Sequence, residues 1–143
     1  MAYSKFHNKK CEYRGEKFDS LKERDRYIYL KSLEAKGEVC CLRRQVEYRL
    51  IPAAHYMKSV QLKTKVKAVR RLLFDGMTYR ADFVYIWHDH HIVEDVKGSS
   101  VRGAVDKVFL IKQKLMWYFY WIKIHIVTSA TEEPYYEKIE SCV

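Results

Sequence analysis

Two aspartates and a lysine lie in neighbouring predicted strands, and their types and spacing could support hydrolysis of a phosphate ester. Asp82 is surrounded by apolar residues, in a place where strand propensity disfavours an acid. Asp95 and Lys97 share one face of the next strand because strand side chains alternate, and Glu94 takes the other face. Carboxylate oxygens suit a hard divalent cation such as Mg²⁺, and a lysine can stabilise charge on a phosphate or orient the attacking water.

The connection between these two strands decides whether the carboxylates meet. The predicted strands are residues 78–87 and 91–97, joined by a tight turn at His88-Asp89-His90. An antiparallel pairing about Asp89 sets Asp82 and Asp95 close together on adjacent strands. Two carboxylates on one face repel unless something occupies the site. The alternative interpretation is a structural ion pair, and Glu94 becomes the acid of the site if the register slips by one residue.

A third carboxylate lies at the start of a predicted helix. Ser20 as N-cap and Glu23 three residues later form a capping box, and the helix runs to Gly37, a typical residue for the position after a helix end. Glu23 has two interpretations, as a structural capping residue or as a site carboxylate that reaches the sheet. Gln45, in a predicted strand, either lines the site or a DNA groove or is an ordinary polar strand residue.

The remaining pattern predicts one α/β domain over residues 1–143, with a mixed central sheet flanked by helices in the order αβββαβ. Its core covers about residues 18–128, residues 53–74 form an extended arm or hairpin that continues the sheet, and residues 129–143 form a peripheral tail. The other predicted features are a strand at 42–51, a turn at Asp75-Gly76, a helix at 105–121 and a closing strand at 123–128. The helix is expected to bury a stripe of Val108, Ile111, Leu115, Tyr118 and Ile122, and its surplus of aromatic residues is a candidate dimer surface.

The net charge is concentrated in one segment of the chain. Residues 41–80 hold ten bases and two acids, which is +8 of the formal net charge of +9. A basic surface of this kind attracts polyanions, since neutralised phosphates release counterions. We therefore expect nucleic-acid contact, with a solubilising loop as the alternative.

Composition excludes several classes of protein. The chain has 143 residues, 48% of them hydrophobic, which is too apolar for a disordered protein. Its apolar runs are far shorter than the ~20 residues that span a bilayer, and Met1–Lys10 shows no secretory signal. We expect a cytoplasmic protein without membrane contact. The four cysteines show no C-x-x-C spacing and are expected to be plain thiols: Cys11, Cys40, Cys41 and Cys142.

The order helix-Glu, Asp, Asp-x-Lys resembles the PD-(D/E)XK nuclease superfamily, and Glu23, Asp82 and Asp95-Val96-Lys97 carry the resemblance. The layout is especially similar to small phage junction-resolving endonucleases of the endonuclease I type. That similarity extends to Ile51-Pro52, Ala81-Asp82-Phe83 and the Gly98 after Lys97, and covers about Phe18 to Thr128. Two positions depart from the common pattern, since Ala81 stands where Pro is usual and Asp95 replaces the commoner Glu.

The resemblance implies a restriction-endonuclease-like core and a metal-dependent DNA endonuclease selective for branched DNA, as in Holliday junction resolvases. It implies catalytic roles for Glu23, Asp82, Asp95 and Lys97, with the three acids holding Mg²⁺ or Mn²⁺. It also implies a homodimer, and a phage-encoded protein would act in the host cytoplasm. The arm is expected to contact DNA through Lys63, Lys65, Lys67, Arg70 and Arg71. The alternatives are a non-catalytic nucleic-acid-binding accessory protein, or a sequence- or end-directed nuclease of the same superfamily.

Overall fold

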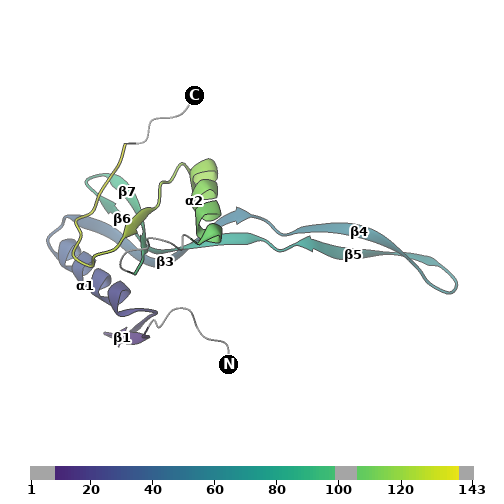
Figure 1. Cartoon of the computed structure of the whole chain (residues 1–143), viewed down its shortest axis with the longest axis horizontal. Coiled ribbons are helices and arrows are strands. Elements are labelled where there is room, and N and C mark those ends of the chain that lie inside the picture. The colour runs from purple at the N-terminus through teal and green to yellow at the C-terminus, as the bar shows by residue number, and fades with distance from the viewer. Residues whose placement is uncertain (1–8, 99–105, 139–143) are drawn as a thin grey trace.

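The computed structural model of the chain describes residues 9–98 and 106–138, in which a long hairpin projects from the body that holds the two helices (Figure 1). The elements are β1 (Cys11–Tyr13), β2 (Glu16–Phe18), α1 (Leu21–Ala35), β3 (Val39–Ile51), β4 (Ala54–Gln61), β5 (Val66–Phe74), β6 (Met77–Trp87), β7 (His90–Val96), α2 (Lys107–Tyr120) and β8 (His125–Val127).

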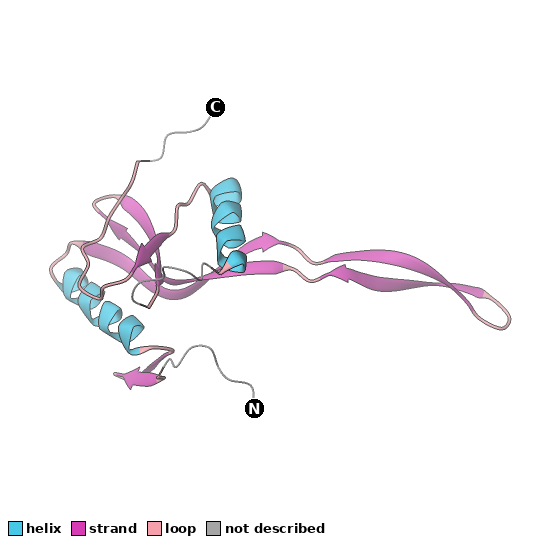
Figure 2. Cartoon of the chain, in the orientation of Figure 1, coloured by secondary structure: helices cyan, strands magenta, loops and turns pink. Residues whose placement is uncertain are grey.

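The body is built on a four-stranded mixed sheet in the order β3-β6-β7-β8. The first three strands pair antiparallel, and β8 pairs parallel with β7. Adjacent residues of β6 pack on opposite sides: Phe83 against α1 residues such as Leu30, and Val84 against α2 residues such as Met116. The two helices therefore cover opposite faces of the sheet (Figure 2), and the predicted mixed α/β architecture is confirmed.

The ends of α1 are those that the sequence predicts. The Ser20 side chain accepts a hydrogen bond from the Glu23 backbone N–H (3.1 Å), as an N-cap does. At the other end Gly37 adopts a positive φ of 78°, and the Glu38 N–H returns to the Leu33 carbonyl (3.0 Å).

The predicted arm is a two-stranded hairpin of β4 and β5, which forms a sheet of its own. The turn predicted at Asp75-Gly76 is wrong: β5 and β6 do not pair, and the chain passes from the hairpin directly into the central sheet. Pro52 lacks the N–H that would continue the β3 ladder. A Cβ on Gly76 would lie 3.1 Å from the Ile51 carbonyl oxygen, so glycine permits the close approach of the two strands at this junction.

The predicted buried stripe of α2 is correct only for Leu115 and Ile122, which pack partly buried against the core. Phe109 and Met116 are its buried residues, whereas Val108, Ile111 and Tyr118 are 50%, 47% and 75% exposed. Apolar residues occupy nearly every side of this helix, so their spacing cannot single out the face that packs on the sheet. The helix begins at Lys107 with Asp106 as N-cap, and the predicted start at Val105 lies outside the described residues.

Two peripheral segments are more ordered than the sequence suggests. The β1–β2 hairpin, which pattern analysis misses, packs against α1 and turns at Arg14 and Gly15, both with positive φ. The described part of the predicted tail, 129–138, is anchored because the Arg26 guanidinium donates to the backbone carbonyls of Ala130 and Glu132. Cys142 and the rest of the tail lie outside the described residues. Neither of the two described helices has the length and apolar character needed to cross a membrane.

Candidate active site

Asp82 and Asp95 lie at the point where the ladder between β6 and β7 ends. The strands pair from Trp87↔His90 to Phe83↔Glu94, and the same register sets Asp82 opposite Asp95. Beyond that last pair, the Val96 N–H donates to Asp82 Oδ2 at 2.8 Å instead of to a β6 carbonyl. The side chain of Asp82 thus replaces a backbone acceptor, which holds this carboxylate beside the strand that carries Asp95.

The regular alternation of β6 is interrupted at Asp82. Ala81 and Val84 both pack on the α2 side of the sheet, although alternating side chains at these positions would face opposite ways. On the neighbouring strand Gln45 adopts a positive φ of 52°, which is uncommon for a residue with a side chain. Its amide donates to Asp82 Oδ1 at 3.4 Å, so Gln45 lines the site, which was one of its two predicted roles.

Both oxygens of Asp95 have a donor. The Tyr79 hydroxyl donates to Oδ2 at 3.0 Å, and the Lys97 ammonium lies 3.0 Å from Oδ1. The same ammonium lies 4.1 Å from the centre of the Phe109 ring, a cation–π contact from α2. Asp95 and Lys97 therefore share a face as predicted.

Glu94 takes no part in this cluster. It lies on the opposite face, fully buried, where Arg26 of α1 binds both of its oxygens (2.9 and 2.6 Å) and the Tyr85 hydroxyl donates to one of them. The alternative that Glu94 is the acid of the site is therefore wrong, because its oxygens are already occupied by a buried ion pair.

Glu23 approaches the two aspartates from α1. Burial, and then the negative charges of Asp82 and Asp19, raise the pKa of Glu23 to about 7, although the nearby Arg44 acts in the opposite direction. Burial, and then the charge of Asp95, raise the pKa of Asp82 to about 6. Glu23 and Asp82 are thus harder to ionise because they are buried and because a second carboxylate lies near each of them.

The donor set fits a hard divalent cation. The predicted set of three carboxylate ligands is not assembled, because among residues 9–98 and 106–138 no three His, Cys, Asp or Glu side chains lie together closely enough to hold a metal ion. Asp82 and Asp95 supply carboxylate oxygens from adjacent strands, and Glu23 is near enough to share their electrostatic field. A divalent cation would offset the repulsion that raises these pKa values, and oxygen ligands are those that Mg²⁺ prefers.

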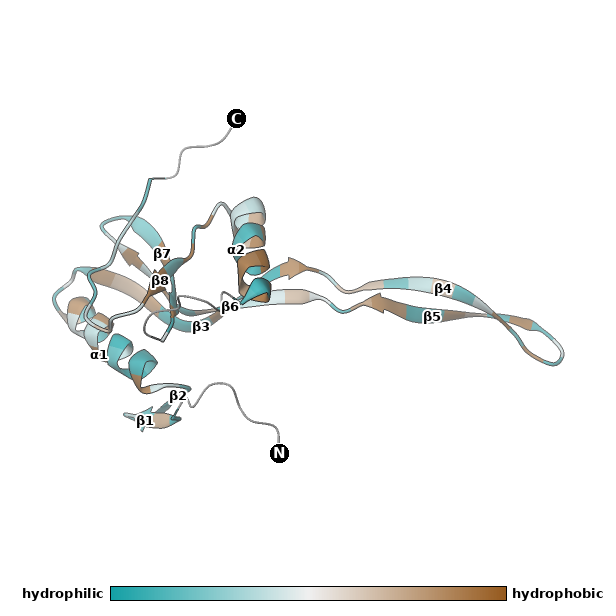
Figure 3. Cartoon of the chain, viewed as in Figure 1, coloured by the Kyte–Doolittle hydropathy of each residue, from teal (hydrophilic) through white to brown (hydrophobic). Residues whose placement is uncertain are grey.

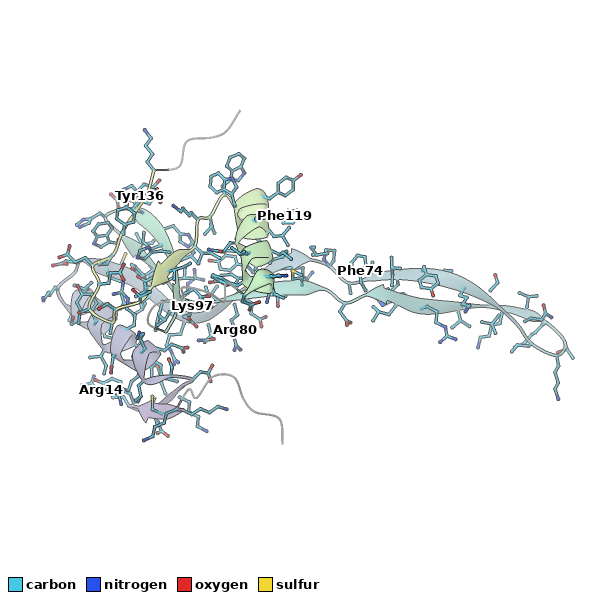
Figure 4. The ribbon with its side chains drawn as sticks, in the orientation of Figure 1. Arg14, Phe74, Arg80, Lys97, Phe119 and Tyr136 are labelled. Atoms are coloured by element: carbon cyan, nitrogen blue, oxygen red, sulfur yellow. The ribbon has the colours of Figure 1, made fainter. Side chains whose placement is uncertain are left out.

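The predicted DNA-binding residues are separate from the predicted catalytic residues. The predicted DNA-binding residues are exposed on the β4–β5 hairpin: Lys63, Lys65, Lys67, Arg70 and Arg71. The side chains of the hairpin project into solvent, whereas Lys97 lies in the body (Figure 4). Of the ten bases in residues 41–80, Arg44 turns inward. It binds Glu16 at 2.6 Å and lies over the Phe18 ring at 3.8 Å.

Sequence reasoning missed Tyr79 and Arg26, each of which binds one of the two neighbouring acids of β7. The sequence indicates only weakly that Tyr79 belongs to the site, since it stands three residues before Asp82 within the same strand. Arg26 stands three residues after Glu23, so the two side chains lie on neighbouring positions of one helix face. Neither spacing is specific enough to assign a partner, because the two partners, Asp95 and Glu94, lie on β7 and not on the element that carries Tyr79 or Arg26.

Comparison with known proteins identifies one family. The family described as "Protein of unknown function (DUF1064)" matches residues 3–135, nearly the whole chain. No curated protein and no solved structure matches the chain.

Proposed function

The chain belongs to the DUF1064 family, and we propose that it is a metal-dependent DNA endonuclease with a restriction-endonuclease-like core of the PD-(D/E)XK type. The observation that carries the proposal is the meeting of Asp82 and Asp95 at the end of the β6–β7 ladder, with the Lys97 ammonium on Asp95. The strand order β3-β6-β7-β8, between helices on opposite faces, supports the same assignment at the level of the fold.

The roles follow from the positions of the side chains. Asp82 and Asp95 would hold Mg²⁺, or Mn²⁺, and Glu23 would reach the cation through water. When bound, the cation supplies Lewis-acid polarisation of the phosphate and favours ionisation of water. Lys97 uses one of its three N–H donors on Asp95, which leaves the others for a phosphate oxygen or the attacking water. The water oxygen forms a new bond to phosphorus and gives up a proton to solvent. The bond between phosphorus and the deoxyribose oxygen breaks, and that oxygen takes up a proton from solvent.

The hairpin supports DNA as the substrate. Residues 54–74 hold six bases and no acid. Strands of eight and nine residues span about 25 to 30 Å at ~3.3 Å per residue. A two-stranded ribbon fits the DNA major groove, and basic side chains on it position the phosphate backbone without reading bases. Contacts of this kind need no base sequence, and selection of branched DNA by its shape would need none either.

One face of the hairpin supports a homodimer. The register places four apolar and four polar residues on one face, where Arg70 is the single lysine or arginine: Met57, Val66, Ala68, Leu72, His55, Ser59, Gln61 and Arg70. Hydrophobic residues are distributed along this exposed ribbon (Figure 3), and Leu72 and Met57 are 50% and 64% exposed. An isolated two-stranded hairpin is marginally stable. We propose that a second copy of the chain packs on this face, which leaves the opposite face to contact DNA with Lys58, Lys67 and Arg71. In this arrangement Arg70, which the sequence predicts to contact DNA, lies on the dimer face.

The homodimer is tested by light scattering coupled to size-exclusion chromatography. The wild type is expected to elute with the mass of two chains, and Leu72→Glu with the mass of one. Trp121→Glu, which changes an exposed apolar residue at the end of α2, is the matched control and should remain a dimer. Loss of the dimer in Trp121→Glu alone would place the interface on α2 instead.

A second candidate function is a non-catalytic DNA-binding accessory protein. The Asp95–Lys97 ion pair favours it, because a buried carboxylate with an ammonium partner is also a common structural arrangement. A third candidate is a sequence- or end-directed nuclease of the same superfamily, which differs in substrate and not in chemistry.

Cleavage of a four-way junction, a nicked duplex and a linear duplex, with and without Mg²⁺, separates these functions. We expect Mg²⁺-dependent nicking of the junction by the wild type, and loss of nicking but not of binding in Asp95→Ala. Asp75→Ala removes an exposed acid between hairpin and sheet and serves as the matched control. If the wild type nicks no DNA with Mg²⁺, the non-catalytic binding protein is favoured. If it cuts linear and branched DNA equally, the sequence- or end-directed nuclease is favoured.

A further inference from the structure

Two consecutive acids of β7 lie on opposite faces of the sheet, and a tyrosine of β6 donates to each. The Tyr79 hydroxyl donates to Asp95 at 3.0 Å, and the Tyr85 hydroxyl donates to Glu94. Both tyrosines are buried, at 3% and 0% exposed. The two pairs are matched in strand, residue type and burial, yet their surroundings differ.

At Glu94 three donors occupy a carboxylate that is fully buried beside its guanidinium partner. The Arg26 guanidinium binds both oxygens, and Tyr85 adds a third donor. This group is a fully buried ion pair that clamps α1 to the sheet. Tyr85 completes a structural contact.

At Asp95 two donors hold the carboxylate and leave it acceptor capacity. A carboxylate oxygen accepts about two hydrogen bonds, and among the described residues each oxygen of Asp95 has one donor, Tyr79 on Oδ2 and Lys97 on Oδ1. The two donors prevent rotation of the carboxylate, and one acceptor direction on each oxygen stays free. A ligand held in this way is oriented before the cation arrives.

Tyr79 is itself firmly placed. Its ring lies 6.4 Å from Tyr48, in a stacked arrangement, and 6.3 Å from Phe109, the residue that also contacts the Lys97 ammonium. Burial and the neighbouring charge of Asp95 raise the pKa of Tyr79, so its hydroxyl keeps its proton and donates. One aromatic group therefore supports both donors to Asp95.

We propose that Tyr79 is a positioning residue that orients Asp95 for a divalent cation, whereas Tyr85 has a structural role only. The inference rests on the proposed function in that Asp95 is taken as a metal ligand. It adds a residue that lies outside the motif and that contacts neither metal nor substrate.

The test compares Tyr79→Phe with Tyr85→Phe, each of which removes one buried hydroxyl and keeps the ring. Mn²⁺ alone is titrated into the full chain without DNA, and free Mn²⁺ is measured by electron paramagnetic resonance. Loss of a group that orients a ligand lowers metal affinity by roughly 10-fold or more, so Tyr79→Phe should bind Mn²⁺ about 10-fold more weakly. Tyr85→Phe should bind like the wild type. Thermal melting sets a temperature at which all three proteins are folded.

A second measurement separates positioning from general damage. In junction cleavage, Tyr79→Phe should need more Mn²⁺ for half-maximal rate, while its metal-free affinity for DNA stays that of the wild type. Equal Mn²⁺ affinity in the wild type and Tyr79→Phe, or equal weakening in both variants, overturns the inference. If Mn²⁺ binding is weakened only in Tyr79→Phe and the wild type cuts no DNA, the positioning role of Tyr79 is supported and the proposed nuclease function is overturned. Absence of Mn²⁺ binding by the wild type overturns both.

Discussion

The candidate active site and the β4–β5 hairpin use charge in opposite ways. At the site, carboxylates of the adjacent strands β6 and β7 and of α1 lie near one another in the body. Burial and repulsion between carboxylates raise the pKa values of Asp82 and Glu23. On the hairpin, six bases stand in solvent in a stretch without a single acid. The first arrangement orients a few atoms for chemistry, and the second attracts a polyanion over a long surface.

This division predicts that chemistry and DNA affinity can be removed separately. Lys97→Ala should lower the cleavage rate of bound junction by about 100-fold or more, because it removes a donor aimed at developing charge. Its metal-free DNA affinity, measured by fluorescence anisotropy, should stay that of the wild type. Lys107→Ala, which removes an exposed lysine at the start of α2, is the matched control. A parallel loss of binding in Lys97→Ala would show that the two regions are not independent.

The reciprocal change sharpens the comparison from the other side. Replacing Lys63, Lys65 and Lys67 by Ala together should reduce the slope of log affinity against log salt by about 3, since each neutralised phosphate contributes about 0.9. The cleavage rate at saturating protein should be unchanged, because these residues lie on the hairpin and the carboxylates lie in the body. A salt slope equal to that of the wild type would remove the hairpin from the DNA interface.

The buried acids predict a pH dependence of stability that the exposed bases do not share. Because the pKa of Asp82 rises from 3.8 to about 6 on folding, the folded state binds its proton more tightly than the unfolded state. The free energy of unfolding, measured by urea denaturation without divalent metal, should therefore fall as pH rises from about 4 to about 7. At 1.36 kcal/mol per pKa unit the contribution of Asp82 is about 3 kcal/mol at most.

Asp82→Asn is the variant that isolates this effect. Asn keeps an acceptor for the Val96 N–H, and a rotated Gln45 amide can accept from the new side-chain NH₂. Stability should then vary less between pH 4 and 6 and exceed that of the wild type at pH 7. An unchanged pH profile would mean that the repulsion among the acids is already relieved in the folded protein.

The residues show which parts of the fold follow from local pattern. Ser20 and Gly37 mark the ends of α1, and the alternation of β7 correctly separates Asp95 and Lys97 from Glu94. The packed face of α2 could not be predicted, because a helix that is apolar on most sides has no unique stripe. The anchoring of residues 129–138 was missed because it depends on Arg26, about a hundred positions away.

The amino-acid sequence by itself determined the strands that carry Asp82 and Asp95, the side of β7 on which Lys97 lies, and the basic character of the hairpin. These properties depend on the alternation of side chains along a strand or on the types of single residues, and each can therefore be read from a short segment of the chain. Only the tertiary structure decided that Tyr79, Gln45 and the Val96 N–H surround the two aspartates, and that Glu94 is bound by Arg26. Those contacts join separate strands and a helix, and hydrogen bonds act over about 3 Å, so they exist only once the sheet has formed and the helices have packed on it.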